Sequence, residues 1–426
     1  MLQSLLDKAD RYLVGGCLGS FRMPDEVATV IARGEGSKVF DVEGREYIDY
    51  ILGSGPMILG HAHPAVVDAV QQQAALGSTY YLPSAPTIKL AERVVEGAPC
   101  GERIRFVSSG TEATFAALRM ARAHTGRDKI LKFEGGWHGG HDYAQQGTTP
   151  TEPADYPQAV ADCAGIPSAV GTSVLVSPFN DAAAAVHLID TRADEIAAVI
   201  VEPLQRTVRP LPGFLEALRE ATQRHGIALI FDEIVTGFRL AWGGAQERYG
   251  VVPDVATYGK TISGGYPIAA VCGRADILDC ADPRRKAQGR DDYAFVSGTV
   301  NGNPIGAAAG LACLDELAKD GVYARLYEVS DRLREGLEAI GKEAGVALQV
   351  LGDGPVLQPF FTDAPILNHV DSLAADTAMA RKWNVEMIRR GILCNPGGKL
   401  YLSLAHSDDD VDRTLQVARE ALAAVA

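Results

Sequence analysis

The sequence has 426 residues, of which 47% are hydrophobic and 22% are charged, a composition typical of folded globular proteins and not of membrane-embedded or disordered chains. Its formal net charge of −14 offers no basic surplus for neutralising phosphates, which argues against a general nucleic-acid binder. The seven cysteines form no CxxC pair, and the N-terminal stretch carries Asp7 and Asp10, so we expect a cytoplasmic protein without a disulfide framework, signal peptide or membrane span.

In chain order, residues 27–60 offer short strand-like segments. From about residue 104 to 273, apolar β-branched runs alternate with helical patterns, as in a wound, mostly parallel sheet covered by helices on both faces. The expected strands of this sheet are 104–109, 129–135, 173–178, 196–203, 227–233, 255–260 and 268–273.

From residue 304 onward the pattern changes to a helical run (304–345), short strands and a last helix. The acidic residues after Ser407 are expected to cap that helix rather than bind a metal. We therefore predict an α/β protein with an N-terminal segment (1–60) that packs with a small α+β domain (304–426), and a large domain (61–303). Residues 146–171 are the best candidate for a mobile lid.

Two glycine-bearing stretches could hold a ligand. Ser109, Gly110 and Thr111 lie between an expected strand and helix, where free N–H groups and the helix dipole favour a phosphate. Considered alone, they are better explained as a capped glycine turn with Glu112 in the first turn of the helix. Trp137 and His138 follow the next strand, and the tryptophan could stack on a flat heterocycle or simply belong to the core. Neither His138 with His141 nor His61 with His63 has further ligands at metal spacing, so no metal is expected.

Asp232 and Lys260 end two successive expected strands. In a parallel sheet the carboxyl ends of neighbouring strands meet in one crevice, so both side chains should line it. Asp232 could pair with an arginine or hold the protonated ring nitrogen of a pyridoxal cofactor. Lys260, desolvated by apolar walls, could form a Schiff base with an aldehyde. Glu233 should point to the other face, as a structural or solvated residue.

With these residues in place, the sequence resembles the class III, fold-type I pyridoxal-phosphate aminotransferases, in particular the glutamate-1-semialdehyde aminomutase branch. The matching stretches include "GHAHPAVVDAV", "SSGTEATFAALRMARAHTGRDKILKFEGGWHGGHD", "FDEIVTGFR", "YGKTISGG" and "SGTVNGNPIGAAAG". The resemblance implies a large domain with a mostly parallel seven-stranded sheet, a smaller C-terminal domain, pyridoxal 5′-phosphate as cofactor, and a homodimer with active sites at the interface.

The resemblance also implies roles for single residues around the cofactor ring. Lys260 matches the lysine that carries the cofactor, and Asp232 matches the partner of the pyridine nitrogen. Trp137 takes the stacking position that is Tyr or Phe in relatives, and Ile234 would pack on the opposite ring face. Glu202 matches a buried active-site glutamate.

Further positions concern the phosphate and the substrate. Gly110 and Thr111, with Ser109, match the phosphate loop, and His138 lies beside the ring. Thr299 resembles the phosphate contact that one subunit donates to the other. Arg22 aligns with an N-terminal arginine that holds a substrate carboxylate.

The chain departs from the aminomutases where the substrate is gripped. Gly19 replaces a serine, Ser54 replaces a tryptophan, and Gly397 or Gly398 stands where an acidic residue is found. Because the cofactor residues are intact, we predict an aminotransferase that moves an amino group from a carboxylate-bearing donor to a keto acid by a ping-pong mechanism. The alternative is an intramolecular aminomutase that uses the same groups.

Overall fold

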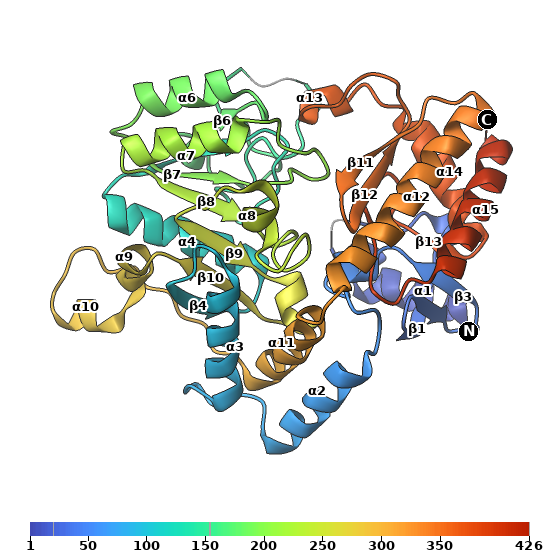
Figure 1. Ribbon diagram of the computed structural model, residues 1–426, viewed down its shortest axis with the longest axis horizontal. Coiled ribbons are helices and arrows are strands. Elements are labelled where there is room, and N and C mark those ends of the chain that lie inside the picture. Colours follow the sequence, from blue (N-terminus) through green and yellow to red (C-terminus); the bar gives the residue numbers. More distant parts are fainter. Residues whose placement is uncertain (20, 153–154, 426) are drawn as a thin grey trace. The chain divides into compact units, whose positions relative to one another are not determined.

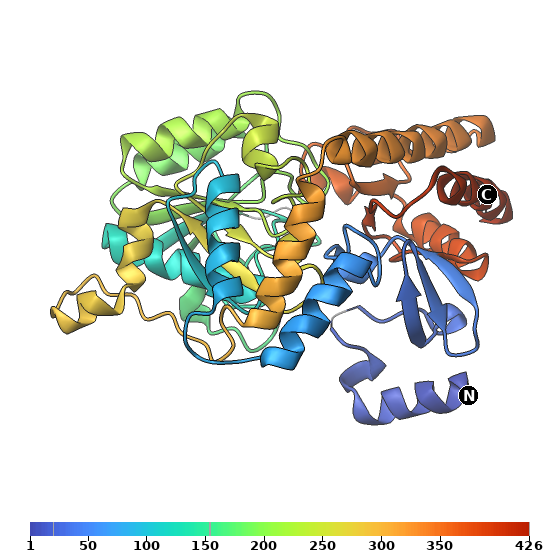
Figure 2. The same cartoon turned by 60° about the horizontal axis from the view of Figure 1, so that its bottom comes forward.

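The computed structural model describes residues 1–19, 21–152 and 155–425 (Figures 1 and 2). The chain forms two compact units. Unit 1 comprises Met1–Pro64, Asp320–Ala364 and Ala374–Ala426, and unit 2 comprises Ala65–Lys319 and Pro365–Leu373.

Unit 2 is built on a seven-stranded sheet with the order β4-β10-β9-β8-β7-β5-β6. The strands are β4 (Arg103–Val107), β5 (Lys129–Phe133), β6 (Val174–Ser177), β7 (Ile196–Val201), β8 (Ala228–Asp232), β9 (Val255–Tyr258) and β10 (Ala269–Gly273). All seven coincide with the predicted strands. β10 pairs antiparallel with both β4 and β9, and the other neighbouring pairs are parallel. The carboxyl ends of β4, β5, β7, β8 and β9 therefore share one edge of the sheet.

Helices cover this sheet because its strands are apolar throughout; β7 is buried at all six positions. The helices of unit 2 are α2 (Pro64–Leu76), α3 (Ala85–Gly97), α4 (Gly110–Thr125), α5 (Ser168–Gly171), α6 (Ala182–Thr191), α7 (Phe214–Arg224), α8 (Gly244–Tyr249), α9 (Ala275–Leu278), α10 (Pro283–Ala287), α11 (Pro304–Leu317) and α13 (His369–Ser372). α4 packs an alanine-rich face on the strands, whereas α6 and α7 lie side by side beside the sheet (Figure 1).

The two units do not divide between residues 303 and 304: α11 belongs to unit 2, whose longer segment ends at Lys319. α11 packs along α3 (Figure 2). Its Gly310 allows this helix to approach the turn after β9, since a Cβ there would lie 2.3 Å from the Ile262 carbonyl oxygen. The apolar pattern runs past this junction, so sequence periodicity alone did not mark it.

Unit 1 contains two small sheets, with the orders β1-β2-β3-β13 and β11-β12-β14. Its core includes the fully buried Leu333, Leu402 and Val411. The strands of residues 27–60 share this unit with C-terminal segments. Its elements are α1 (Leu2–Tyr12), β1 (Ile31–Glu35), β2 (Lys38–Asp41), β3 (Glu46–Asp49), α12 (Val322–Ala344), β11 (Gln349–Asp353), β12 (Val356–Phe360), α14 (Thr377–Arg389), β13 (Ile392–Leu393), β14 (Leu400–Tyr401) and α15 (Asp408–Val425).

The acidic start of α15 is a cap, as the sequence predicts. The Asp410 N–H donates to the Ser407 hydroxyl (3.1 Å), and the Ser407 N–H donates to the Asp410 carboxylate (2.9 Å). Asp408 pairs with Arg325 and Arg332. The described residues contain no group of three or more side chains suited to a metal ion, and none of their helices is long and apolar enough to cross a bilayer.

Candidate active site

Five of the predicted site segments follow strands whose carboxyl ends lie at the same edge of the unit 2 sheet. Ser109–Thr111 follow β4, Trp137–His138 follow β5, Glu202 follows β7, Asp232 ends β8 and Lys260 follows β9. The parallel arrangement thus brings together segments that are up to about 150 residues apart in the chain, as expected for a ligand crevice in an open α/β sheet.

The start of α4 forms an anion cradle. The Ser109 hydroxyl caps the helix by accepting the Glu112 N–H (3.3 Å), and the Ser108 N–H donates back to the Glu112 carboxylate (3.0 Å). Within the described residues the N–H groups of Gly110 and Thr111 have no acceptor, so they remain available to an anion at the positive end of the helix dipole.

A glycine of the loop after β5 packs against this cradle. Gly139, at φ +100°, passes so close that a Cβ would lie 2.7 Å from the Thr111 Cα. The Thr111 hydroxyl accepts the Gly140 N–H at 3.1 Å. The close approach fixes the β5 loop, which carries Trp137, on the first turn of α4.

Asp232 is a buried carboxylate with three hydrogen-bonding groups around it. It accepts from the Thr257 hydroxyl (3.1 Å) and the Ile234 N–H (3.2 Å), and its second oxygen is 2.8 Å from His138 Nδ1. No lysine or arginine among the described residues forms an ion pair with it. The charge of this carboxylate is therefore left for a cationic or N–H donor that the crevice would bind.

Trp137 and Glu202 are tied together. The backbone N–H of Trp137 donates to one Glu202 carboxylate oxygen at 2.7 Å. This bond fixes the backbone of Trp137, a residue that is 42% exposed. Ile234 lies between two glycines, because a Cβ at Gly110 would be 3.2 Å, and one at Gly259 3.1 Å, from its side chain. The stacking roles of Trp137 and Ile234 stay predictions.

Lys260 follows β9 after Gly259 and has a left-handed backbone conformation, with φ +41°, at the start of the turn Lys260–Ser263. Burial is the main cause that lowers the pKa of its amine to about 8, while Asp232 counteracts this effect. The amine makes no hydrogen bond with any described residue. A partly desolvated amine with a lowered pKa is a nucleophile at neutral pH.

Glu233, next to Asp232, is structural and not solvated. It is fully buried, and its carboxylate accepts from the Thr236 hydroxyl (2.9 Å), the Ala245 N–H (2.6 Å) and the Gln246 amide (2.9 Å). Burial raises the pKa of this carboxyl group.

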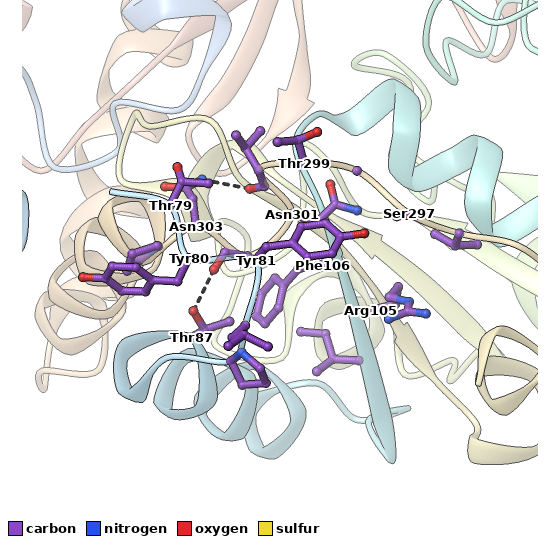
Figure 3. A pocket seen from close by; sticks show the side chains of 18 residues that line it. Thr79, Tyr80, Tyr81, Thr87, Arg105, Phe106, Ser297, Thr299, Asn301 and Asn303 are labelled. Atoms are coloured by element: carbon purple, nitrogen blue, oxygen red, sulfur yellow. Dashed lines mark hydrogen bonds between the residues drawn. The ribbon is translucent and has the colours of Figure 1, made fainter. Parts of the chain in front are cut away.

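Thr299 is exposed and lines a separate cavity of about 340 Å³ in unit 2 (Figure 3). Tyr80, Tyr81 and Phe106 contribute its aromatic walls, and the Thr87 hydroxyl donates to the Gly302 carbonyl at 2.7 Å. None of the described residues that line this cavity belongs to the five site segments at the sheet edge.

Arg22 and Ser54 belong to unit 1, not to the unit that carries Lys260. The Arg22 guanidinium contacts Asp10 (2.9 Å) and Asp25 (3.0 Å). Ser54 is exposed, with φ +68°, and its N–H donates to the Ile51 carbonyl (2.8 Å). Their assignment to the substrate stays a prediction.

Sequence reasoning missed three residues near this edge. Thr257 holds Asp232, and Lys132 is a fully buried lysine on β5 whose amine contacts the Ala144 and Gln146 carbonyls at 2.7 Å each. Arg206 follows Glu202 in the loop after β7. The charge in "KILKF", inside an otherwise apolar strand, was the one available signal for Lys132.

Comparison with known proteins identifies the family. The model of the family described as "Aminotransferase class-III" matches residues 22–421. The chain belongs to the class-III aminotransferases.

Individual relatives agree with this assignment. The chain is 39% identical to glutamate-1-semialdehyde 2,1-aminomutase 2 of Brevibacillus brevis, over 98% of this chain and 97% of that protein. Among solved structures it is similar to an ω-transaminase from Sphaerobacter thermophilus, with a TM-score of 0.94, 34% identity, and coverage of 99% of this chain and 97% of that one. It is also similar to a glutamate-1-semialdehyde aminomutase from Pseudomonas aeruginosa in complex with PMP (TM-score 0.89, 26% identity, 100% and 94% covered).

The comparisons confirm the predicted family, the fold-type I α/β architecture and the cofactor: this aminotransferase-family enzyme depends on pyridoxal phosphate and acts on small molecules. They favour the alternative expectation, an aminomutase, over an aminotransferase that uses a separate donor and keto acid.

The residues present fit this cofactor. The free N–H groups of Gly110 and Thr111 suit its phosphate, and the buried Asp232 suits a protonated pyridine nitrogen. His138 Nε2 is a buried nitrogen without a partner among the described residues, so the crevice has an unused polar atom beside Asp232. Lys260 supplies the amine.

Proposed function

We propose that this enzyme moves an amino group within one carboxylate-bearing amino-aldehyde, in the manner of the glutamate-1-semialdehyde 2,1-aminomutases. The observation that carries the proposal is the 39% identity to such an enzyme over nearly the whole of both chains. The position of Lys260, Asp232 and the start of α4 at one sheet edge of unit 2 supports the proposal.

When bound, pyridoxal phosphate supplies an electron sink that stabilises negative charge on the substrate carbon. Asp232 keeps the ring nitrogen protonated, because its buried carboxylate strongly favours a nearby positive charge. As a free amine, Lys260 Nζ would take the proton from the amine-bearing carbon of the substrate and return a proton to the carbon that receives the amino group. The lowered pKa of its amine lets it act as a base near neutral pH.

The need for a second substrate tests this proposal. Holoenzyme with glutamate-1-semialdehyde as the only substrate is expected to form the isomeric aminoketone over many turnovers without a keto acid. If turnover stops after one equivalent and resumes on adding pyruvate or 2-oxoglutarate, the aminomutase proposal is wrong.

A second candidate is an intermolecular aminotransferase, favoured by the three departures from the aminomutase pattern. Gly19, Ser54 and Gly397 or Gly398 all lie in unit 1, and a solved structure similar to this chain is named an ω-transaminase. In the same assay, a panel of α-, β- and ω-amino donors read by cofactor absorbance would identify the donor.

A further inference from the structure

The loop after β7 holds an arginine in a restrained and unusual conformation. Arg206 has φ +59°, a left-handed backbone conformation that few residues other than glycine adopt. Its N–H donates to a Glu202 carboxylate oxygen at 3.3 Å, and the Val208 N–H donates to the Gln205 carbonyl at 2.8 Å. The Gln205 amide, in turn, donates to the Glu134 carbonyl at 2.7 Å. These bonds hold the turn rigidly, so the strained residue has a fixed position.

Glu202 connects this turn to the candidate active site. One of its carboxylate oxygens accepts the backbone N–H of Arg206, and the other accepts the backbone N–H of Trp137 at 2.7 Å. The Arg206 charge is also one of the influences that lower the pKa of the Lys260 amine, so the guanidinium lies within electrostatic reach of that amine. Arg206, Glu202, Trp137 and Lys260 all belong to unit 2.

The guanidinium of Arg206 is not engaged by other described residues. The residue is exposed, and its side chain forms no hydrogen bond or ion pair with any described residue. Arg22, which the sequence suggests for the substrate carboxylate, already contacts Asp10 and Asp25. An unpaired guanidinium on a backbone that is held in place can bind a carboxylate through two parallel hydrogen bonds.

We propose that Arg206 binds the carboxylate of the amino substrate and thereby selects carboxylate-bearing substrates over simple amines. A phosphate is a poorer match for this position, because the cradle for the cofactor phosphate is formed at the end of β4 by Gly110 and Thr111. The inference rests on the proposed function, since it names the residue that gives that site its substrate class.

The test uses holoenzyme and matched ligands that differ only in the carboxylate. Dissociation constants of 3- to 5-carbon ω-amino acids and of the corresponding alkylamines are measured by titrating the cofactor absorbance, for the wild type, Arg206→Met, Arg206→Lys and Arg209→Met. The methionine keeps an unbranched stem at the strained position, and Arg209 is an exposed arginine of the same loop that serves as the control.

Arg206→Met is expected to weaken binding of the amino acids about 30-fold or more, and to change that of the amines less than twofold. Arg206→Lys should fall between, and Arg209→Met should match the wild type. The inference is overturned if the wild type binds the acids no more tightly than the amines, or if Arg206→Met weakens both classes equally or neither. Turnover by the wild type, measured separately, decides the proposed function without affecting these binding ratios.

Discussion

Lys260 combines a strained backbone, in the turn that follows β9, with an amine whose pKa is lowered by burial. Only the neutral amine attacks an aldehyde. We therefore expect the rate at which cofactor-free enzyme captures pyridoxal phosphate to rise about tenfold per pH unit below pH 8 and to level off above it.

Stopped-flow absorbance between pH 6 and 10 measures this rate, and Lys260→Ala, which should form no borohydride-trappable adduct, is the control. A midpoint near the ordinary lysine pKa of 10.5 would show that burial does not tune this amine.

Asp232 is the second residue whose role can be isolated. Asp232→Asn keeps the shape and one acceptor oxygen but removes the charge that holds the ring nitrogen protonated. The single-turnover rate should fall about 100-fold or more, with cofactor content and thermal unfolding close to those of the wild type. A loss of less than tenfold would contradict the assigned role.

At the scale of elements, Lys132 on β5 fastens the segment that follows the candidate active-site loop, because its amine contacts two carbonyls and the Thr148 hydroxyl (3.0 Å). Burial lowers the pKa of this lysine to about 7 from an ordinary value of 10.5. Between these two values the unfolded chain binds more protons than the folded one, so this residue's contribution to stability rises with pH.

The unfolding free energy of the wild type minus that of Lys132→Met should therefore rise from pH 7 to pH 10, by up to about 1.4 kcal/mol per pH unit. Denaturant titrations at four pH values measure it, with Lys129→Met as the control. Lys129 is the half-buried first residue of the same strand and pairs with Glu195. A difference that stays constant over this range would be inconsistent with a lysine that is neutral when buried.

The strands of unit 2 could be predicted because each buried strand is a short apolar run, and Asp232 and Lys260 stand out as charges at the ends of such runs. The end of the unit 2 segment after α11 could not be predicted. The small residues of α11 pack on α3 and on the turn after β9, and these contacts exist only in the folded chain. Arg206 was also beyond sequence reasoning: its left-handed turn and its tie to Glu202 are properties of the folded loop.

At the scale of the molecule, the resemblance predicts a homodimer in which Thr299 of one subunit completes the phosphate site of the other. Hybrid dimers of Lys260→Ala and Thr299→Ala chains test this arrangement. If Thr299 acts across the interface, one of the two sites in each hybrid has both native residues, and about half of the wild-type activity should return.

If Thr299 acts within its own subunit, each hybrid site lacks one native residue, and mixing the two variants restores nothing. Size-exclusion chromatography with light scattering confirms that the hybrids are dimers, and cofactor retention by each parent variant separates a binding defect from misfolding.

The division of the chain into units has an evolutionary consequence. The lysine, the acid and the anion cradle come from strand ends of a single sheet, whereas Arg22, Ser54 and Gly397 belong to unit 1. Mutations can thus accumulate in unit 1 without altering the lysine, the acid or the anion cradle, all of which unit 2 carries by itself.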